Sequence, residues 1–211
     1  MNSKILNTDF YLRRDVVAQA KELLGKVLHT RIHGKHTSGI IIETEAYAGI
    51  KDKGSHAYGG RRTQRTQIMY NAGGCAYIYL CYGMHHLFNV VTSIADEPHA
   101  ILIRSIIPFQ GTEIMQSRTK KEIIKPVDGI GPGRVSKLLG INKLQTGKLL
   151  ENNLNSDVCI WISDEGYMLE PEDIIITPRI GIAYAAEDAL LPYRFVWNKK
   201  NKVPFSGNFI F

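Results

Sequence analysis

The chain has 211 residues, 44% of them hydrophobic, which is enough for one domain with a filled core and too few for two domains of ordinary size. Lys and Arg number 26 against 20 Asp and Glu, so the net charge is +6 and the pI is near 9.2. This excess favours a polyanionic partner, with nucleic acid ahead of an acidic membrane, although a basic but otherwise ordinary protein stays open. No apolar run reaches the roughly 18 residues of a membrane helix, so we expect no membrane association.

The elements expected in the first part are, in chain order, a helix over residues 15–24, strands over 26–32 and 40–47 with a turn over 34–38 between them, and a polar loop over 48–67. Asp15 is suited to cap the helix and Gly25 to end it. The polar loop is long for a compact domain, and long ordered loops are usually functional.

The elements expected next are a turn over 71–74, strands over 75–82, 87–94 and 99–107, a helix over 112–121, a glycine-rich loop over 126–133, a helix over 134–139, and strands over 158–163, 174–177 and 194–197. Residues 83–86 form the turn of a hairpin between the first two of these strands. Strands outnumber helices and neighbours join through hairpins, so we expect a mostly antiparallel α+β fold in one domain over residues 1–211.

The cysteines are Cys75, Cys81 and Cys159. Their odd number and wide scatter argue against a disulfide framework and for a reducing compartment. Residues 1–15 are basic and lack the apolar stretch of a signal peptide. We therefore expect a cytoplasmic protein.

The otherwise apolar strand expected over residues 40–47 carries two carboxylates. Side chains alternate along a strand, so Glu43, Glu45 and Tyr47 point the same way. Burying two carboxylates is costly, so this side faces either solvent or a pocket in which one carboxylate polarises a water. Arg104 interrupts another apolar strand and needs an anionic partner, for which Glu45 is a candidate. Such a pair would keep the glutamate ionised and ready to act as a base, or it would be purely structural.

The 75–94 hairpin is rich in aromatic residues. Tyr77 and Tyr79 share one face, where tyrosine commonly serves only as packing. Tyr82 falls on the other face beside Gly83, a poor place for a core residue and a suitable one for a wedge between stacked bases. Asn89 interrupts the apolar return strand.

Basic side chains gather in two further places. Arg61, Arg62 and Arg65 lie in the long polar loop, and Arg134 and Lys137 lie on the helix that follows the glycine-rich loop. Both groups are suited to phosphate contacts, although a solvated loop is an equal alternative for the first. His85-His86 invites a metal interpretation, but adjacent strand residues point apart, so we expect no metal site and no cofactor.

Together these motifs resemble those of the alkyladenine, or 3-methyladenine, DNA glycosylase family of the mammalian type, over about residues 15–197. The motifs, in family order, are Glu-Thr-Glu-Ala-Tyr, His-x-x-Gly-Gly-Arg, Tyr-x-Tyr-x-x-Tyr-Gly-Met, an Asn, Leu-x-Arg, Gly-Pro-Gly-Arg and Arg-Ile-Gly-Ile. The resemblance implies a single α+β domain around a curved antiparallel sheet, with a protruding β-hairpin and flanking helices. The His85-His86 pair, aromatic in mammalian members, is typical of bacterial ones, so the expected location is the bacterial cytosol and nucleoid.

The resemblance also implies a role for individual residues. Glu45 would be the general base that activates water, Arg104 would hold the water and the glutamate, and Ile180 would offer a backbone carbonyl to the water.

For the base pocket, the resemblance implies that Tyr47, His56 and Tyr79 sandwich the extruded base. Asn89 would sit at the pocket floor and disfavour the exocyclic amine of guanine. Tyr82 would fill the gap in the duplex from the minor groove.

The resulting prediction is a monofunctional enzyme, most simply a monomer, that acts on double-stranded DNA containing damaged purines and leaves an abasic site. The charge of an alkylated purine attracts it to tyrosine faces. The preference among 3-methyladenine, 7-methylguanine, hypoxanthine and ethenoadenine stays open. Alternatives are a non-enzymatic binder of distorted duplexes, an RNA-directed hydrolase, and a metal-dependent hydrolase using His56, His85 and His86.

Overall fold

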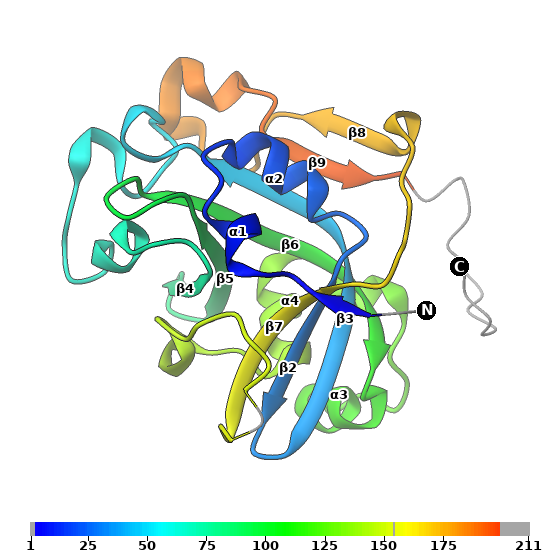
Figure 1. The fold of residues 1–211 in the computed structure, drawn as a ribbon. Coiled ribbons are helices and arrows are strands. Elements are labelled where there is room, and N and C mark those ends of the chain that lie inside the picture. The colour runs from blue at the N-terminus through cyan, green and yellow to red at the C-terminus, as the bar shows by residue number, and fades with distance from the viewer. Residues whose placement is uncertain (1–2, 154, 199–211) are drawn as a thin grey trace.

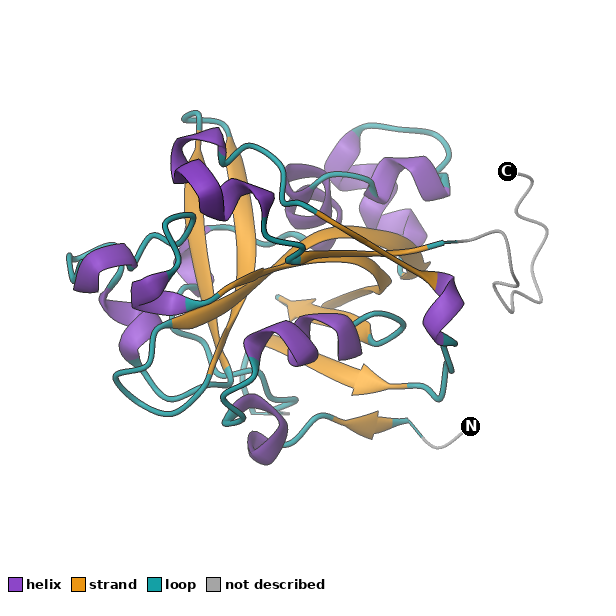
Figure 2. Ribbon diagram, turned by 90° about the horizontal axis from the view of Figure 1, so that it is seen from above, coloured by secondary structure: helices purple, strands orange, loops and turns teal. Residues whose placement is uncertain are grey.

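The computed structural model describes residues 3–153 and 155–198, so the outermost residues of the predicted 1–211 domain lie outside it. Within those ranges the strands form a nine-stranded sheet with the order β1-β7-β2-β3-β6-β5-β4, and β9 joins β8 to β3. The strand bounds are β1 Lys4–Ile5, β2 Val27–Ile32, β3 Lys35–Tyr47, β4 Cys75–Cys81, β5 His85–Thr92, β6 His99–Gln110, β7 Val158–Asp164, β8 Ile174–Thr177 and β9 Arg194–Trp197. Neighbouring strands pair antiparallel, and the sheet is strongly curved (Figure 1; Figure 2), which confirms the predicted α+β fold.

The α-helices are α1 Thr8–Tyr11, α2 Val16–Glu22, α3 Thr112–Thr119 and α4 Pro132–Leu139. Short 3₁₀ segments lie at Gly49–Lys51, Tyr58–Gly60, Gln67–Tyr70, Pro126–Gly129, Lys143–Gln145, Pro171–Asp173 and Ala183–Leu190. Asp15 caps α2 as predicted, because its side chain accepts a hydrogen bond from the amide of Ala18 at 2.9 Å. No helix within the described ranges is long and apolar enough to cross a bilayer.

The helices cover the sheet and close its core. Helix α2 packs across β3 and β6, and α4 packs across β5 and β6. Their apolar side chains join one buried cluster with the inner faces of these strands, including Ala20, Val135, Phe88 and Ile103. Burial of this apolar surface holds the central strands in place.

The predicted turn over residues 34–38 is wrong, because β3 begins at Lys35 and the turn is only His33-Gly34. Both turn residues have positive φ, 49° for His33 and 73° for Gly34, as a two-residue hairpin turn requires. The polar residues after the turn continue the ladder with β2. The prediction also missed β1 and α1, which are too short to show a periodic pattern.

Strands β3 and β6 carry bulges where the sequence had suggested simple alternation. Glu43 pairs with Ser105 and Thr44 with Ile103, which leaves Arg104 as an extra residue in β6; Ile42 is the extra residue in β3. Bulges bend a strand and redirect side chains. Here the bulge lets Arg104 and its neighbour Ser105 both reach Glu43.

Candidate active site

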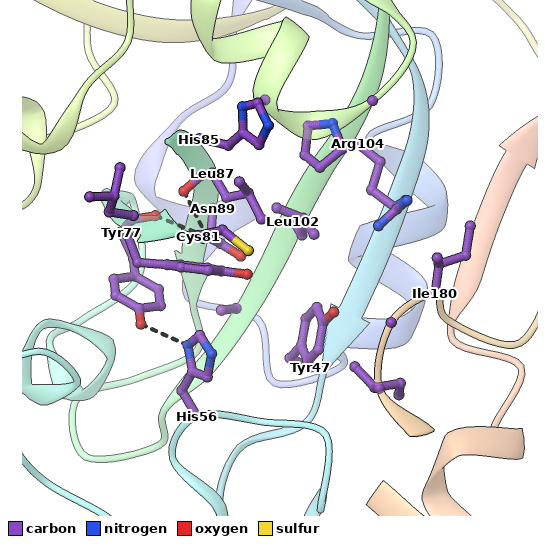
Figure 3. A pocket seen from close by; sticks show the side chains of 18 of the residues that line it. Tyr47, His56, Tyr77, Cys81, His85, Leu87, Asn89, Leu102, Arg104 and Ile180 are labelled. Carbon is purple, nitrogen blue, oxygen red and sulfur yellow. Dashed lines mark hydrogen bonds between the residues drawn. The ribbon is translucent and has the colours of Figure 1, made fainter. Parts of the chain in front are cut away.

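A cleft of about 690 Å³ opens where the β4–β5 hairpin, the ends of β3 and β6, the start of α4 and the segment after Arg179 meet. This volume is within the range of small-molecule sites. Tyr47 and His56 lie on either side of the cleft, with Arg104 and Ile180 on the side of Tyr47 (Figure 3). Tyr79 and Asn89 also line it. The structure therefore gathers every residue predicted for the base pocket around one cavity.

Glu45 lies behind the side of the cleft formed by Tyr47, Arg104 and Ile180, and it is 0% exposed. Its Oε1 accepts a hydrogen bond from the backbone amide of Ile180 at 2.8 Å and lies 3.3 Å from Nη1 of Arg104. Its Oε2 accepts a hydrogen bond from the Tyr47 hydroxyl at 2.9 Å. The three groups that hold the carboxylate all line the cleft. The predicted pairing of Arg104 with Glu45 is thereby confirmed.

Arg104 acts on Glu45 in the predicted direction, because its charge lowers the pKa of this carboxyl and so favours the ionised form. Burial raises the pKa of Glu45, and this outweighs the opposing effects of Arg104, the Ile180 amide and the Tyr47 hydroxyl. The carboxyl with the lowered pKa is Glu43, where burial is outweighed by hydrogen bonds from Ser105 and Arg194 and by the charges of Arg104 and Arg194. A glutamate with a raised pKa is a stronger base once it is ionised.

The opposite wall is a cluster of aromatic rings. The ring centroids of His56 and Tyr79 are 4.7 Å apart, and those of Tyr77 and Tyr79 are 5.6 Å apart. Nδ1 of His56 lies 2.8 Å from the Tyr77 hydroxyl, and Nε2 lies 3.1 Å from a guanidinium nitrogen of Arg65. Because a guanidinium only donates, Nε2 is the acceptor and Nδ1 carries the proton. Burial and the charges of Arg65 and Arg61 lower the pKa of His56 to about 4, so the imidazole is neutral near pH 7.

Asn89 is buried at the cleft, beside the rings of β4. Its amide nitrogen donates to the backbone carbonyls of Tyr77 at 3.1 Å and Leu87 at 3.3 Å. Both donor hydrogens are therefore used by the protein, and the side-chain carbonyl is the group left to meet a ligand.

Tyr82 stands at the tip of the hairpin and is 87% exposed. Tyr82 and Gly83 both have positive φ, 51° and 69°, and the amide of Met84 closes the turn on the carbonyl of Cys81 at 3.1 Å. A bulky residue in the left-handed region is uncommon and costs free energy. The structure therefore holds a large, unpacked ring in a strained position beside the cleft.

The three loop arginines predicted for phosphate contacts have different surroundings in the structure. Arg65 turns toward the cleft, where it donates to His56 and its guanidinium carbon lies 4.9 Å from the centroid of the Tyr79 ring. Arg62 pairs with Asp96 at 3.0 Å and lies over the Tyr70 ring at 4.6 Å. Arg61 is exposed. The difference arises because short 3₁₀ segments fold this loop back on itself.

Helix α4 presents the other predicted basic pair. Arg134 and Lys137 are both exposed, one turn apart, and Arg134 lines the cleft. The glycine-rich start of α4 also lines the cleft and packs against the hairpin, where a Cβ on Gly133 would lie 3.0 Å from atoms of His85. The described residues contain no group of three or more His, Cys, Asp or Glu side chains placed to share a metal ion.

Residues that support the site from behind were missed from the sequence. Arg179 has a side chain that is 0% exposed, makes a bidentate pair with Asp52 at 2.5 and 2.8 Å, and lies under the Tyr47 ring at 4.8 Å. This pair ties the long loop to the segment that carries Ile180, and these segments lie side by side in Figure 1. The available signal was the place of Arg179 in the Arg-Ile-Gly-Ile motif, of which only Ile180 was used.

Comparison with known proteins agrees with these motifs. Residues 9–201 match the methylpurine-DNA glycosylase (MPG) family. A Chlamydia abortus (strain DSM 27085 / S26/3) protein named "Putative 3-methyladenine DNA glycosylase" is 48% identical over 201 residues, which cover 93% of this chain and 100% of the relative. Proteins of the same name from Desulfitobacterium hafniense (strain Y51) and Clostridium perfringens (strain 13 / Type A) are 41% and 40% identical, covering 91% and 93% of this chain and 94% and 97% of the relatives. The chain therefore belongs to the methylpurine-DNA glycosylase family.

Proposed function

We propose that this DNA glycosylase extrudes alkylated or deaminated purines from double-stranded DNA and hydrolyses their N-glycosidic bond with a water activated by Glu45. Because the family consists of glycosylases, the chain is an enzyme that hydrolyses N-glycosyl bonds in DNA. The interpretations as a non-enzymatic binder and as an RNA-directed hydrolase are therefore wrong. The lesion class, base extrusion and the role of each residue belong to the proposal.

The observation that carries the proposal is the environment of Glu45. A buried carboxylate lies behind a cleft of ligand size, and each of its contacts is a group that lines that cleft. Within the part of the chain that the structure describes, Oε1 has two partners, Arg104 and the Ile180 amide, whereas Oε2 has one, the Tyr47 hydroxyl. Oε2 is therefore the oxygen that would take a proton from water. The Ile180 contact observed uses the amide, so a water contact to its carbonyl remains part of the proposal.

In the proposed step, the oxygen of water bonds to the anomeric carbon of the sugar while the N-glycosidic bond breaks. The electron pair of that bond leaves with the base, and one proton of water passes to Oε2 of Glu45. The products are the free base and an abasic site. Extrusion must come first, because the bond is out of reach inside the duplex, as holds for DNA glycosylases as a class.

The walls of the cleft support purine binding by stacking. Tyr47, His56 and Tyr79 offer flat faces, and their electron-rich rings attract a cationic alkylated purine. The neutral His56 adds no charge that would repel such a base. The Asn89 carbonyl is an acceptor at the floor. Tyr82, exposed at the hairpin tip, would enter the space that the base vacates.

We further propose a monofunctional reaction carried out by a monomer. A glycosylase that also cuts the strand uses an amine to form a Schiff base, and among the described residues that line the cleft there is no lysine. Borohydride treatment during turnover should therefore trap no covalent enzyme–DNA product, and a trapped adduct would refute this part of the proposal.

The experiment that tests the proposal compares wild type with Glu45→Gln on duplexes that each carry one defined lesion: 3-methyladenine, 7-methylguanine, hypoxanthine or ethenoadenine. Base release is measured as alkaline strand cleavage. Loss of a general base should slow release by about 10²–10⁴-fold while lesion-DNA binding is retained. The matched control is Glu22→Gln. Glu22 is an exposed acid that pairs with Arg13 and does not line the cleft, so this variant should release base at the wild-type rate. Near-normal release by Glu45→Gln would remove Glu45 from its role.

A further inference from the structure

Glu43 is a buried carboxylate that lies near the cleft without lining it. It is 7% exposed. It accepts hydrogen bonds from Nε of Arg104 at 3.0 Å, from Nε of Arg194 at 2.6 Å and from the Ser105 hydroxyl. The proposed hydrolysis does not use it. The three donors explain how this anion can be buried, because each of them offsets part of the free-energy cost of burial.

Arg104 bridges Glu43 and Glu45. Its Nε donates to Glu43, and its Nη1 lies 3.3 Å from Oε1 of Glu45. Arginine has many rotamers, and confining it costs conformational entropy. Anchoring the Nε edge on Glu43 confines the guanidinium so that its other edge meets Glu45. The β6 bulge at Arg104 is what brings both carboxylates within reach of the same side chain.

The anchor is itself tied to elements distant in sequence. Arg194 comes from β9, which pairs with β3 beside Glu43, and its Nη1 also reaches the Thr177 hydroxyl at 3.1 Å. The Ser105 hydroxyl accepts a hydrogen bond from the amide of Gly131 at 3.2 Å, in the loop that lines the cleft. Glu43 is therefore held from two sides independently of Arg104.

We propose that Glu43 is a positioning residue, held by Arg194 and Ser105, that fixes Arg104 against Glu45 and divides the charge of Arg104 between the two carboxylates. This inference rests on the proposed role of Glu45 as the base. In this proposal Glu43 contacts neither DNA nor the attacking water. Its effect on the reaction passes through Arg104.

The charges around Glu45 give the inference a definite sign. Arg104 lowers the pKa of Glu45, as do the Ile180 amide and the Tyr47 hydroxyl, whereas the negative charge of Glu43 raises it. Arg194 donates to the same oxygen of Glu43 as Arg104 does, Oε1, and Arg179 lies behind Tyr47. Because the pKa of Glu43 is lowered from that of an ordinary glutamate, Glu43 is anionic near pH 7. Removing its charge leaves more of the Arg104 charge for Glu45, so the pKa of Glu45 should fall.

The test is the pH dependence of single-turnover base release from a hypoxanthine duplex. The acidic limb of this profile is the range in which the rate falls with pH because Glu45 becomes protonated. In Glu43→Gln, which keeps an oxygen to accept from Arg104, this limb should move to lower pH by on the order of one unit. The rate on the plateau should also fall, because Glu45 becomes a weaker base. A merely structural Glu43 would change the plateau and leave the limb in place. A limb that stays where it is in wild type, or moves to higher pH, would overturn the inference.

A second variant changes the same balance in the opposite direction. Arg194→Gln removes a cation from Glu43 while leaving Glu43, Arg104 and Glu45 intact. The charge of Glu43 is then balanced less, so it raises the pKa of Glu45 more strongly, and the acidic limb of the rate profile should move to higher pH. Arg194 is 22% exposed in its side chain and is less demanding to replace than Glu43. An unmoved limb in this variant would likewise count against the inference, even if Glu43→Gln fails to fold. Glu22→Gln again serves as the control that should move nothing.

The outcomes separate the two proposals. If Glu45→Gln remains active, the proposed role of Glu45 fails and the source of the acidic limb lies elsewhere. If Glu45→Gln is inactive and the limb is unmoved in both Glu43→Gln and Arg194→Gln, the base stands and only the positioning role is refuted.

Discussion

Replacing Tyr82 with asparagine should change stability and DNA binding in opposite directions. The Tyr82 side chain is 87% exposed, so its removal loses almost no buried contact. Its φ of 51° lies in the left-handed region, which costs most residues roughly 1–2 kcal/mol and which asparagine adopts more readily. Asparagine before glycine is also the preferred pair for such a turn. We therefore expect Tyr82→Asn to raise the free energy of unfolding by about 0.5–1 kcal/mol.

The same substitution should weaken binding to a lesion duplex. Stacking of one base on an aromatic side chain contributes about 1–3 kcal/mol, and asparagine has no ring to supply it. At about 1.4 kcal/mol per factor of ten, this raises Kd by about 5- to 150-fold. Kd is measured by fluorescence anisotropy in the Glu45→Gln background, so that the lesion is not excised during the titration.

The β2–β3 hairpin supplies a matched control. His33 has a φ of 49°, is followed by Gly34, and is exposed at a turn that does not line the cleft. His33→Asn should therefore give a similar gain in urea or thermal unfolding with no change in Kd. If Tyr82→Asn lowers stability, or if its Kd equals that of wild type, Tyr82 is a packing residue and the reasoning is wrong.

Further predictions concern the groups around the base and the pocket wall. Tyr47→Phe removes a hydrogen bond that lowers the pKa of Glu45, so the acidic limb of the rate profile should move to higher pH, and a limb at the wild-type pH would contradict this. Arg179→Met leaves Asp52 buried without its partner and should lower the unfolding free energy in urea by about 3–5 kcal/mol, a loss that an unchanged midpoint would exclude. The pKa of His56 is lowered to about 4 from an ordinary 6.5, so the unfolded chain binds the proton first and the contribution of His56 to stability is lost as pH falls from about 6.5 toward 4; His56→Gln should lack this part of the decline in thermal unfolding measured across that window. Base release should be unaffected by a metal chelator, whereas inactivation that added metal reverses would support a metal-dependent hydrolase.

Much of the site was predictable because its chemistry lies in short local patterns. Glu45 and Tyr47 face the same way because strand side chains alternate, and the structure brings their polar atoms together. Tyr82 was recognisable as a hairpin-tip residue from its neighbour Gly83. The helix at Asp15 and most strands likewise follow from capping residues and apolar alternation over a few positions.

What the sequence by itself determined is therefore most of the strands, the α+β class and the motifs that identify the family. The tertiary structure alone determined which charged side chains contact one another. The bulge at Arg104, the docking of Arg194 beside Glu43 and the turn of Arg65 into the pocket each depend on residues far away in the chain. Burial likewise raises the pKa of Glu45, an effect that the sequence could not show, because desolvation depends on everything packed around a group and the sequence shows only its neighbours along the chain.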